Sequence, residues 1–376
     1  MLKKKLIIIS LSLLIASFFF GVTVGVYKIP PYNILNFAFD KLKGETIAQT
    51  SNDVYVENDP AALIEIHSDK DILEKRIKLI NYIFKDNTIF YDAIPEKIEQ
   101  NIQDERYKSL ENLERIDKFS IFMEHGVNSY SYLFLAKNSN KKLLIYHQGH
   151  EGDFINGYKV IQTLLKKNYS VLAFSMPLTG QNTNPVVELD HFGKFKLIYH
   201  DDLKFLESEN FSPLKYFIKP VSASLNYIDK NYQFDHYYMT GISGGGWTTG
   251  VYSAIDPRIE KSFPIAGTAP IFLRFNNPKN AGDYEQLVPG FYRIANYLDQ
   301  YIMASYGQNR EQMQIFNKFD PCCLSGDKFK IYEKPIQDTM SHLGKGKFSI
   351  FIDEFNQQHS ISTDTLNRIL HEMDTS

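Results

Sequence analysis

The stretch Tyr237-Tyr238-Met239-Thr240-Gly241-Ile242-Ser243-Gly244-Gly245-Gly246 decides the fold. It opens as an aromatic-rich run typical of a short buried strand, and Gly241–Gly245 then fits the pattern G-x-S-x-G. In that pattern a strand turns sharply into a helix, and the serine at the turn exposes its hydroxyl at the sheet edge. The following residues, Trp247–Tyr252, are compatible with a helix. A phosphate-binding loop is the alternative, but it would need a lysine that is not nearby. The pattern makes Ser243 a candidate nucleophile.

Strands and helices alternate on both sides of this turn. The pattern predicts a hairpin from Ser120–Glu124 and Tyr130–Leu135, and later strands at Leu143–Tyr146, Val171–Phe174, Tyr237–Met239, Ser262–Ala266, Gln314–Phe316 and Phe348–Ile352. Helices are predicted through Val160–Leu165, near Val221–Tyr232 and at Ser360–Met373. This order predicts an α/β domain over residues 119–376, with a mostly parallel central sheet and helices on both faces. Two long insertions, near residues 177–219 and 269–310, have the length of functional loops.

A serine nucleophile needs a base, and His359 is the best placed histidine. It follows the strand Phe348–Ile352 after a short loop and is expected to open the last helix. His342 lies inside a predicted helix, and His371 lies near the C-terminus on the last one. The chain order serine, acid, histidine that accompanies this type of turn also favours His359.

The acid that orients the base should follow the preceding strand. Asp320 comes just after Gln314–Phe316, and Asp327 is its nearest competitor. We prefer Asp320 because a shorter loop holds a side chain more firmly. The two cysteines of the chain, Cys322 and Cys323, are adjacent and follow this acid. They could form a vicinal disulfide or remain two small thiols, and they offer no zinc-ligand spacing.

An oxyanion would need two backbone N–H donors. One is expected from Gly244, directly after the nucleophile, and the other from the glycine-rich loop His147–Gly152, with His150 as the preferred donor. His147 and His150 could also suggest a metal, but no third ligand is visible in the sequence. We therefore expect no metal site and no cofactor.

The N-terminus predicts a membrane location. Lys3–Lys5 precede the uncharged run Leu6–Tyr27, which is long enough to cross a bilayer. The lysines should stay inside and send the rest of the chain to the extracytoplasmic side. A cleaved signal peptide is the alternative, although the only small-x-small site, at Thr23–Gly25, is poor. We expect a single-pass anchor at residues 1–28, and a helical stalk or N-terminal layer at 29–118 that includes a helix near Lys97–Leu113.

Composition excludes one class of function. The formal net charge is −3, and no basic cluster occurs beyond Lys3–Lys5. Nucleic-acid binding proteins usually carry a clustered basic surface. We therefore expect no nucleic-acid partner; the oligomeric state is left open.

Taken together, the loop Tyr146–Gly152, the turn Gly241–Gly245, Asp320 and His359 resemble the α/β-hydrolase superfamily, and its carboxylesterase, dienelactone-hydrolase and prolyl-oligopeptidase-like branches most. The resemblance covers about residues 119–373. It implies attack by Ser243 on an acyl carbon, with His359 as base, Asp320 orienting it, and Gly244 and His150 N–H groups binding the oxyanion. The expected activity is hydrolysis of a small-molecule, glycan or lipid ester. An acyltransferase or peptidase with the same residues, and a non-catalytic envelope scaffold of this fold, are the alternatives.

Overall fold

The computed structural model describes residues 17–24, 58–274 and 281–375. The chain divides into two compact units, Met1–Asn52 and Asp53–Ser376. In the first unit, residues 17–24 are helical. Most of the predicted anchor at residues 1–28 lies outside the described residues. Within the described ranges, no helix has both the length and the apolarity needed to span a membrane.

In its described residues, the second unit is built on a nine-stranded sheet in the order β1-β2-β3-β5-β4-β8-β9-β10-β11. The strands are β1 (Lys97–Glu99), β2 (Leu113–Ile121), β3 (Ser129–Ala136), β4 (Lys142–His147), β5 (Ser170–Phe174), β8 (His236–Ile242), β9 (Ile259–Ile265), β10 (Glu311–Asn317) and β11 (Lys347–Asp353). Neighbours from β5 to β11 are parallel, whereas β1, β2 and β3 join the sheet in antiparallel fashion. The predicted α/β class with a mostly parallel sheet is confirmed.

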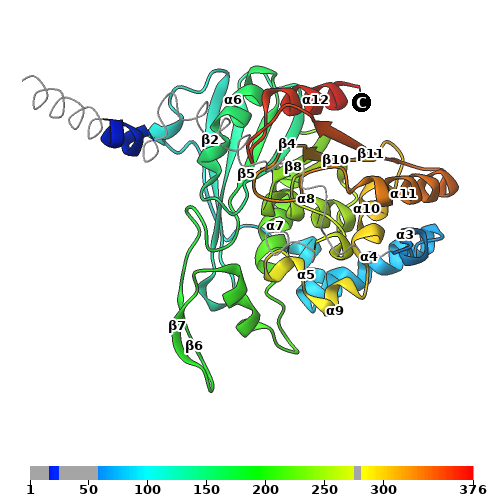
Figure 1. The fold of residues 1–376 in the computed structure, drawn as a ribbon. Helices are drawn as coiled ribbons and strands as arrows, with labels where there is room; N and C mark the ends of the chain where they lie inside the picture. The colour runs from blue at the N-terminus through cyan, green and yellow to red at the C-terminus, as the bar shows by residue number, and fades with distance from the viewer. Residues whose placement is uncertain (1–16, 25–57, 275–280, 376) are drawn as a thin grey trace, which may run out of the picture. The chain divides into compact units, whose positions relative to one another are not determined.

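Helices cover both faces of the sheet (Figure 1). One face packs against α6 (Tyr158–Lys166) and α12 (Thr363–Asp374). The other packs against α7 (Lys215–Asn231), α8 (Gly244–Ile255), α10 (Tyr297–Ser305) and α11 (Lys330–Leu343). Every residue of α8 is buried, so the helix that follows Ser243 is a central element of the core.

In the described part of the second unit, three helices precede the sheet in the chain. They are α3 (Pro60–Leu63), α4 (Asp69–Phe84) and α5 (Asn87–Asp92). The Ser68 hydroxyl caps α4 by accepting a hydrogen bond from the Asp71 N–H. Ile72, Ile80 and Ile83 are buried along one stripe of α4. The Arg76 guanidinium donates to the Ala254 carbonyl of α8, so α4 is fastened to the central helix.

The predicted helix near Lys97–Leu113 is wrong. Its apolar residues recur at intervals of three to five, which imitates a helical stripe. In the structure Ile98 lies in the short strand β1, which pairs with β2, and Tyr107 lies in a 3₁₀ turn with its ring buried. Backbone pairing with the sheet edge therefore overrides the local pattern.

The two insertions carry their own short elements. The first contains the hairpin β6 (Val186–Leu189) and β7 (Gly193–Lys196) and the 3₁₀ helix η4 (His200–Leu206). The second contains η5 (Ile271–Leu273), η7 (Tyr284–Gln286) and α9 (Pro289–Tyr292) before α10.

Two helix starts differ from expectation. Helix α7 begins at Lys215, earlier than predicted, and α12 begins at Thr363 with Ser362 as its cap. His359 therefore lies in the preceding loop and does not open the helix.

Candidate active site

Ser243 lies at the turn between β8 and α8. Its backbone angles, φ 56° and ψ −125°, fall in a region that non-glycine residues rarely adopt. The Ser243 N–H donates to the Ile265 carbonyl at 2.9 Å, and the Trp247 N–H donates to the Ser243 carbonyl at 3.0 Å. Hydrogen bonds to β9 and within α8 therefore hold this residue in a strained conformation, as expected for a strand-to-helix turn that presents a serine.

The glycines around this turn are required by close backbone contacts. A Cβ atom on Gly245 would lie 2.2 Å from the His147 carbonyl oxygen, and one on Gly149 would lie 2.8 Å from the Ser243 Cβ. Strands β4 and β8 are parallel neighbours with His147 opposite Gly241, so the loop after β4 lies directly beside the turn. Among the described residues, no acceptor takes up the N–H of Gly244 or of His150. Both donors are therefore available to a ligand.

The structure brings Asp320 and His359 together. His359 Nδ1 lies 2.8 Å from Asp320 Oδ2, and Asp320 is 3% exposed. Asp320 also accepts at Oδ1 from the N–H of Cys322 at 2.9 Å and of Cys323 at 3.4 Å. A carboxylate oxygen accepts hydrogen bonds, so the contact with Asp320 favours the tautomer of His359 that carries its hydrogen on Nδ1. Nε2 then has a lone pair.

Ser243 and His359 line one cavity. The cavity has a volume of about 320 Å³, and its other lining residues include Ala266, Gly267, Arg274, Asp283, Gln286, Cys322, Cys323 and Leu324. His359 Nε2 is buried and has no hydrogen-bond partner among the described residues, so the bond from Ser243 is not formed. Such contacts are often long in the absence of substrate and tighten when it binds.

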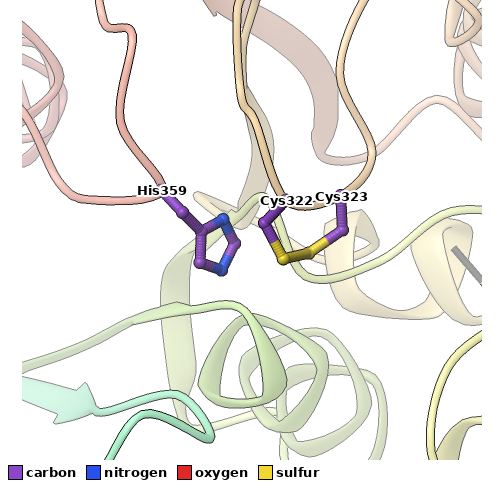
Figure 2. Close-up of side chains that lie close together, drawn as sticks. All are labelled: Cys322, Cys323 and His359. Atoms are coloured by element: carbon purple, nitrogen blue, oxygen red, sulfur yellow. A yellow bond between two sulfur atoms is a disulfide. The ribbon is translucent and has the colours of Figure 1, made fainter. Parts of the chain in front are cut away.

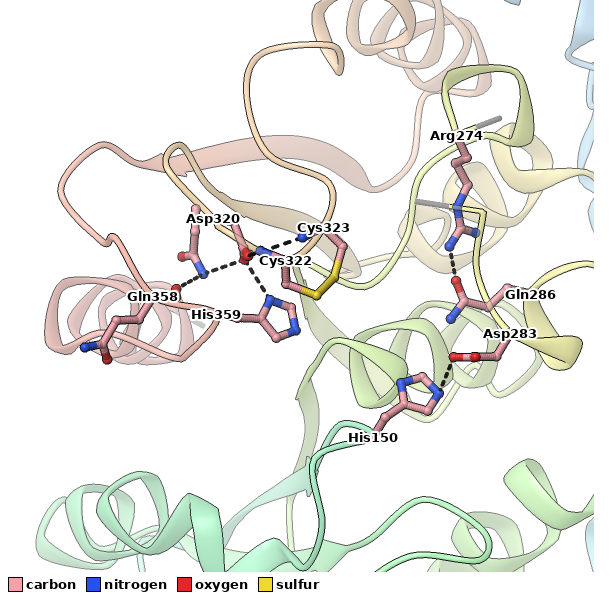
Figure 3. The surroundings of a disulfide bond; sticks show 10 residues. His150, Arg274, Asp283, Gln286, Asp320, Cys322, Cys323, Gln358 and His359 are labelled. Carbon is pink, nitrogen blue, oxygen red and sulfur yellow. Dashed lines mark hydrogen bonds and ion pairs between the residues drawn. A yellow bond between two sulfur atoms is a disulfide. The ribbon is translucent and has the colours of Figure 1, made fainter. Parts of the chain in front are cut away.

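Cys322 and Cys323 form a disulfide beside the His359 ring (Figure 2). The bridge joins adjacent residues and forms part of the cavity wall. Figure 3 shows its surroundings: Asp320 and His359 lie on one side, and His150 and Asp283 lie across the cavity. The bridge closes a small ring that contains the peptide bond between Cys322 and Cys323. This ring restricts the motion of the two cysteine N–H groups that donate to Asp320.

The residues that were rivals on sequence grounds lie elsewhere. Asp327 is exposed and pairs with Lys330 at 2.7 Å. His342 and His371 are exposed on α11 and α12. The His147 ring is buried at the end of β4 and contacts the Gln148 carbonyl at 2.9 Å, and burial lowers its pKa to about 4. None of these four groups lines the cavity of Ser243.

Comparison with known proteins identifies the fold. No family model matches the sequence, and no curated protein matches it. Among solved structures, the acetyl xylan esterase from Paenibacillus sp. R4 superposes with a TM-score of 0.52 at 14% identity, over 84% of this chain and 98% of that one. Acetyl xylan esterase 1 from Thermoanaerobacterium sp. JW/SL YS485 gives 0.52 at 13% identity, over 81% and 93%. The chain has the α/β-hydrolase fold.

Two further residues fix the histidine loop of this α/β-hydrolase fold, and sequence reasoning missed both. Buried Asn317, at the end of β10, donates from Nδ2 to the carbonyls on either side of His359, at Gln358 and Ser360. Asp353, at the end of β11, accepts from the Phe355 and Asn356 N–H groups and from the Ser362 hydroxyl. Each residue directly follows a predicted strand, which was the available signal, because side chains at the carboxyl ends of parallel strands gather at one edge.

The His150 side chain points away from the hydrogen-bonded pair of Asp320 and His359, toward the two insertions. Its Nε2 lies 3.0 Å from Asp283 and 3.1 Å from Glu285. Burial by itself would lower the pKa of His150, but these two carboxylates outweigh it and raise the pKa to about 10. Burial alone would raise the pKa of Glu285, whereas His200 and His150 hold it well below its usual range. His200, Asp283 and Glu285 were not expected at the site.

Proposed function

We propose that the protein is a serine ester hydrolase that works through an acyl-enzyme. One observation carries the proposal. Ser243, on a strained turn at the N-terminus of α8, shares a cavity with a His359 whose Nδ1 is hydrogen-bonded to a buried carboxylate. Acyl transfer requires this arrangement, in which a nucleophile and a base face one cavity and an acid behind the base orients it.

The residues would act in a fixed order. His359 Nε2 takes the Ser243 proton while the serine oxygen attacks the acyl carbon, and Asp320 stabilises the imidazolium that forms. The N–H groups of Gly244 and His150 donate to the oxyanion, and the N-terminus of α8 adds a favourable dipole. His359 then protonates the leaving alcohol. In the second half-reaction His359 Nε2 takes a proton from a water molecule, whose oxygen attacks the acyl carbon of the Ser243 ester. The bond from this carbon to Ser243 Oγ breaks, His359 returns the proton to Oγ, and the carboxylic acid leaves.

The cavity favours esters with a short acyl group. Its volume of about 320 Å³ lies near the lower end for ligand pockets. Arg274, Asp283 and Gln286 make part of its wall polar. We therefore propose acetyl and similarly small esters as the substrate class, with a polar alcohol as the leaving group.

Hydrolysis of p-nitrophenyl acetate by the full chain tests the proposal. Ser243→Ala should lower turnover by ~10⁴-fold or more, because the acyl-enzyme cannot form. Ser341→Ala, an exposed serine on α11, is the matched control and should leave turnover unchanged. Wild-type turnover in Ser243→Ala would contradict the assignment. A wild-type chain without activity on esters or peptides would favour the scaffold alternative, and transfer to an added alcohol in preference to water would favour the acyltransferase.

We also propose that the run Leu6–Tyr27 anchors the enzyme, with the second unit on the extracytoplasmic side. An uncharged segment of this length behind three lysines supports this orientation. The protein should stay with membranes during carbonate extraction, and protease added from outside should digest Asp53–Ser376. A mature N-terminus after Gly25 would contradict the anchor and indicate a removed signal peptide.

A further inference from the structure

Four side chains from three separate segments converge beside the loop His147–Gly152, which is called here the oxyanion loop. They are called here the His–carboxylate cluster, and they are His150 after β4, His200 of η4, and Asp283 and Glu285 of the second insertion. His150 Nε2 lies 3.1 Å from His200 Nδ1, 3.1 Å from Glu285 Oε1 and 3.0 Å from Asp283 Oδ2. His200 Nδ1 lies 3.2 Å from Glu285 Oε2.

The cluster has too few hydrogens for all four of these contacts to be hydrogen bonds. His200 Nε2 lies 2.9 Å from the Pro177 carbonyl and must donate to it, so in the neutral ring Nδ1 presents a lone pair to the cluster. His150 Nε2 carries at most one hydrogen, yet three acceptors surround it at about the same distance. If both imidazoles were protonated, their facing nitrogens would repel. At least two of the four contacts therefore lack a hydrogen, whichever tautomers are chosen.

The spacing and the charge fit a small divalent cation. Ligand atoms arranged tetrahedrally around a metal with bonds of 2.0–2.1 Å lie roughly 3.3 Å apart. The four separations given above, 3.0–3.2 Å, are close to this value, and the ligand atoms all lie within 4.8 Å of one another. The two carboxylates supply a charge that a divalent ion neutralises, and Glu285 is fully buried, where an uncompensated charge is costly. The Pro177 carbonyl orients His200 in the way that carbonyls commonly orient metal-binding histidines.

We propose that the His–carboxylate cluster binds one zinc-class divalent cation. Two imidazole nitrogens and two carboxylate oxygens suit Zn²⁺, whereas Mg²⁺ and Ca²⁺ prefer oxygen ligands alone. Four protein ligands close the coordination sphere, so the ion has a structural role. It ties the oxyanion loop at His150 to both insertions. Asp283, whose side chain is 48% exposed and lines the cavity of Ser243, gives the ion a path of entry.

Metal content of the untagged full chain tests the site without reference to activity. After removal of metal with a chelator and dialysis against ZnCl₂, the protein should hold one Zn²⁺ per chain, as measured by mass spectrometry of the elements. Zinc at a hundredfold excess over Kd should raise the melting temperature by roughly 3–5 °C, because the ion binds only the folded state. MgCl₂ should produce neither effect. Ser243→Ala should bind zinc like the wild type, so this result is separate from the proposed hydrolase activity.

Ligand variants locate the ion. Glu285→Gln and His200→Gln should weaken zinc binding by ~100-fold or more and abolish the thermal shift. His236→Gln is the matched control, since His236 forms a simple pair with Glu260 at 2.9 Å and should not affect binding. A wild-type chain that takes up no stoichiometric zinc overturns the proposal, and this measurement decides the matter even if the ligand variants do not fold. Retention of zinc by folded Glu285→Gln and His200→Gln overturns it as well.

Discussion

At the scale of single residues, the carboxylate beside His359 is the choice that sequence reasoning left open. Asp320 is buried and contacts His359 Nδ1, whereas Asp327 is exposed and pairs with Lys330. Asp320→Asn should lower turnover on p-nitrophenyl acetate by about 10³–10⁴-fold, because an amide no longer favours the tautomer in which Nε2 is the base. Asp327→Asn should change turnover less than twofold. The opposite ranking of the two variants would assign the acid to Asp327.

Two glycines of α8 test the packing of the serine turn. On Gly245 a Cβ would meet the His147 carbonyl oxygen at 2.2 Å, whereas on Gly250 the nearest atom would be 3.9 Å away. Gly245→Ala should therefore lower the free energy of unfolding by roughly 2–4 kcal/mol. Gly250→Ala should stay within about 1 kcal/mol of the wild type, because alanine also favours the helix. Urea unfolding of both variants measures this difference, and equal stabilities would contradict the close contact.

At the scale of elements, Asp353 organises the loop that carries His359. Burial would raise the pKa of Asp353, but hydrogen bonds from the Ser362 hydroxyl and from the Phe355 and Asn356 N–H groups outweigh it and hold the pKa below its usual range. A lowered pKa in the folded state stabilises the fold above the unfolded-state value near 4, and this contribution is lost as the pH falls. Asp353→Asn should be less stable than the wild type at pH 7, and the gap should narrow below about pH 4.

The same variant should also affect catalysis, because a looser loop misplaces the base. Turnover at pH 7 should fall by on the order of tenfold, with little change in KM. Glu354→Gln is the neighbouring control; its exposed carboxylate contacts Lys318 at 3.4 Å and should affect neither quantity. A stability gap that widens at low pH would show that Asp353 is not held ionised by these donors.

The strands that are buried on both faces could be predicted from the sequence. β4, β5 and β8 read as short apolar runs followed by glycine or polar residues, so their positions and the turn at Ser243 could be predicted. Edge strand β1 has three residues and depends on pairing with β2, which no local pattern reveals. The His–carboxylate cluster was not predictable, because its residues are separated by up to 135 positions and only the folding of both insertions brings them together.

At the scale of the whole molecule, buried Arg310 links several elements of the second unit. Its guanidinium donates to the carbonyls of Ile259, Met303, Tyr306 and Ser253, near the ends of β9, α10 and α8. Arg310→Met should lower the free energy of unfolding by roughly 3–5 kcal/mol, because several buried carbonyls would lose their donor. Arg293→Met, which changes an exposed arginine directly after α9, should cost less than about 1 kcal/mol. Equal losses in chemical denaturation would contradict this role.

The proposed chemistry depends on one atom, the Ser243 Oγ, and covalent labelling tests it most directly. A fluorophosphonate probe should modify the full chain once, and peptide mass spectrometry should place the adduct on the peptide containing Ser243. Ser243→Ala should take up no label. His359→Ala should be labelled at least ~100-fold more slowly than the wild type, because the Ser243 hydroxyl loses its base. Stoichiometric labelling at another residue, or an unreactive wild-type chain that is folded, would contradict the assignment of Ser243 as the nucleophile.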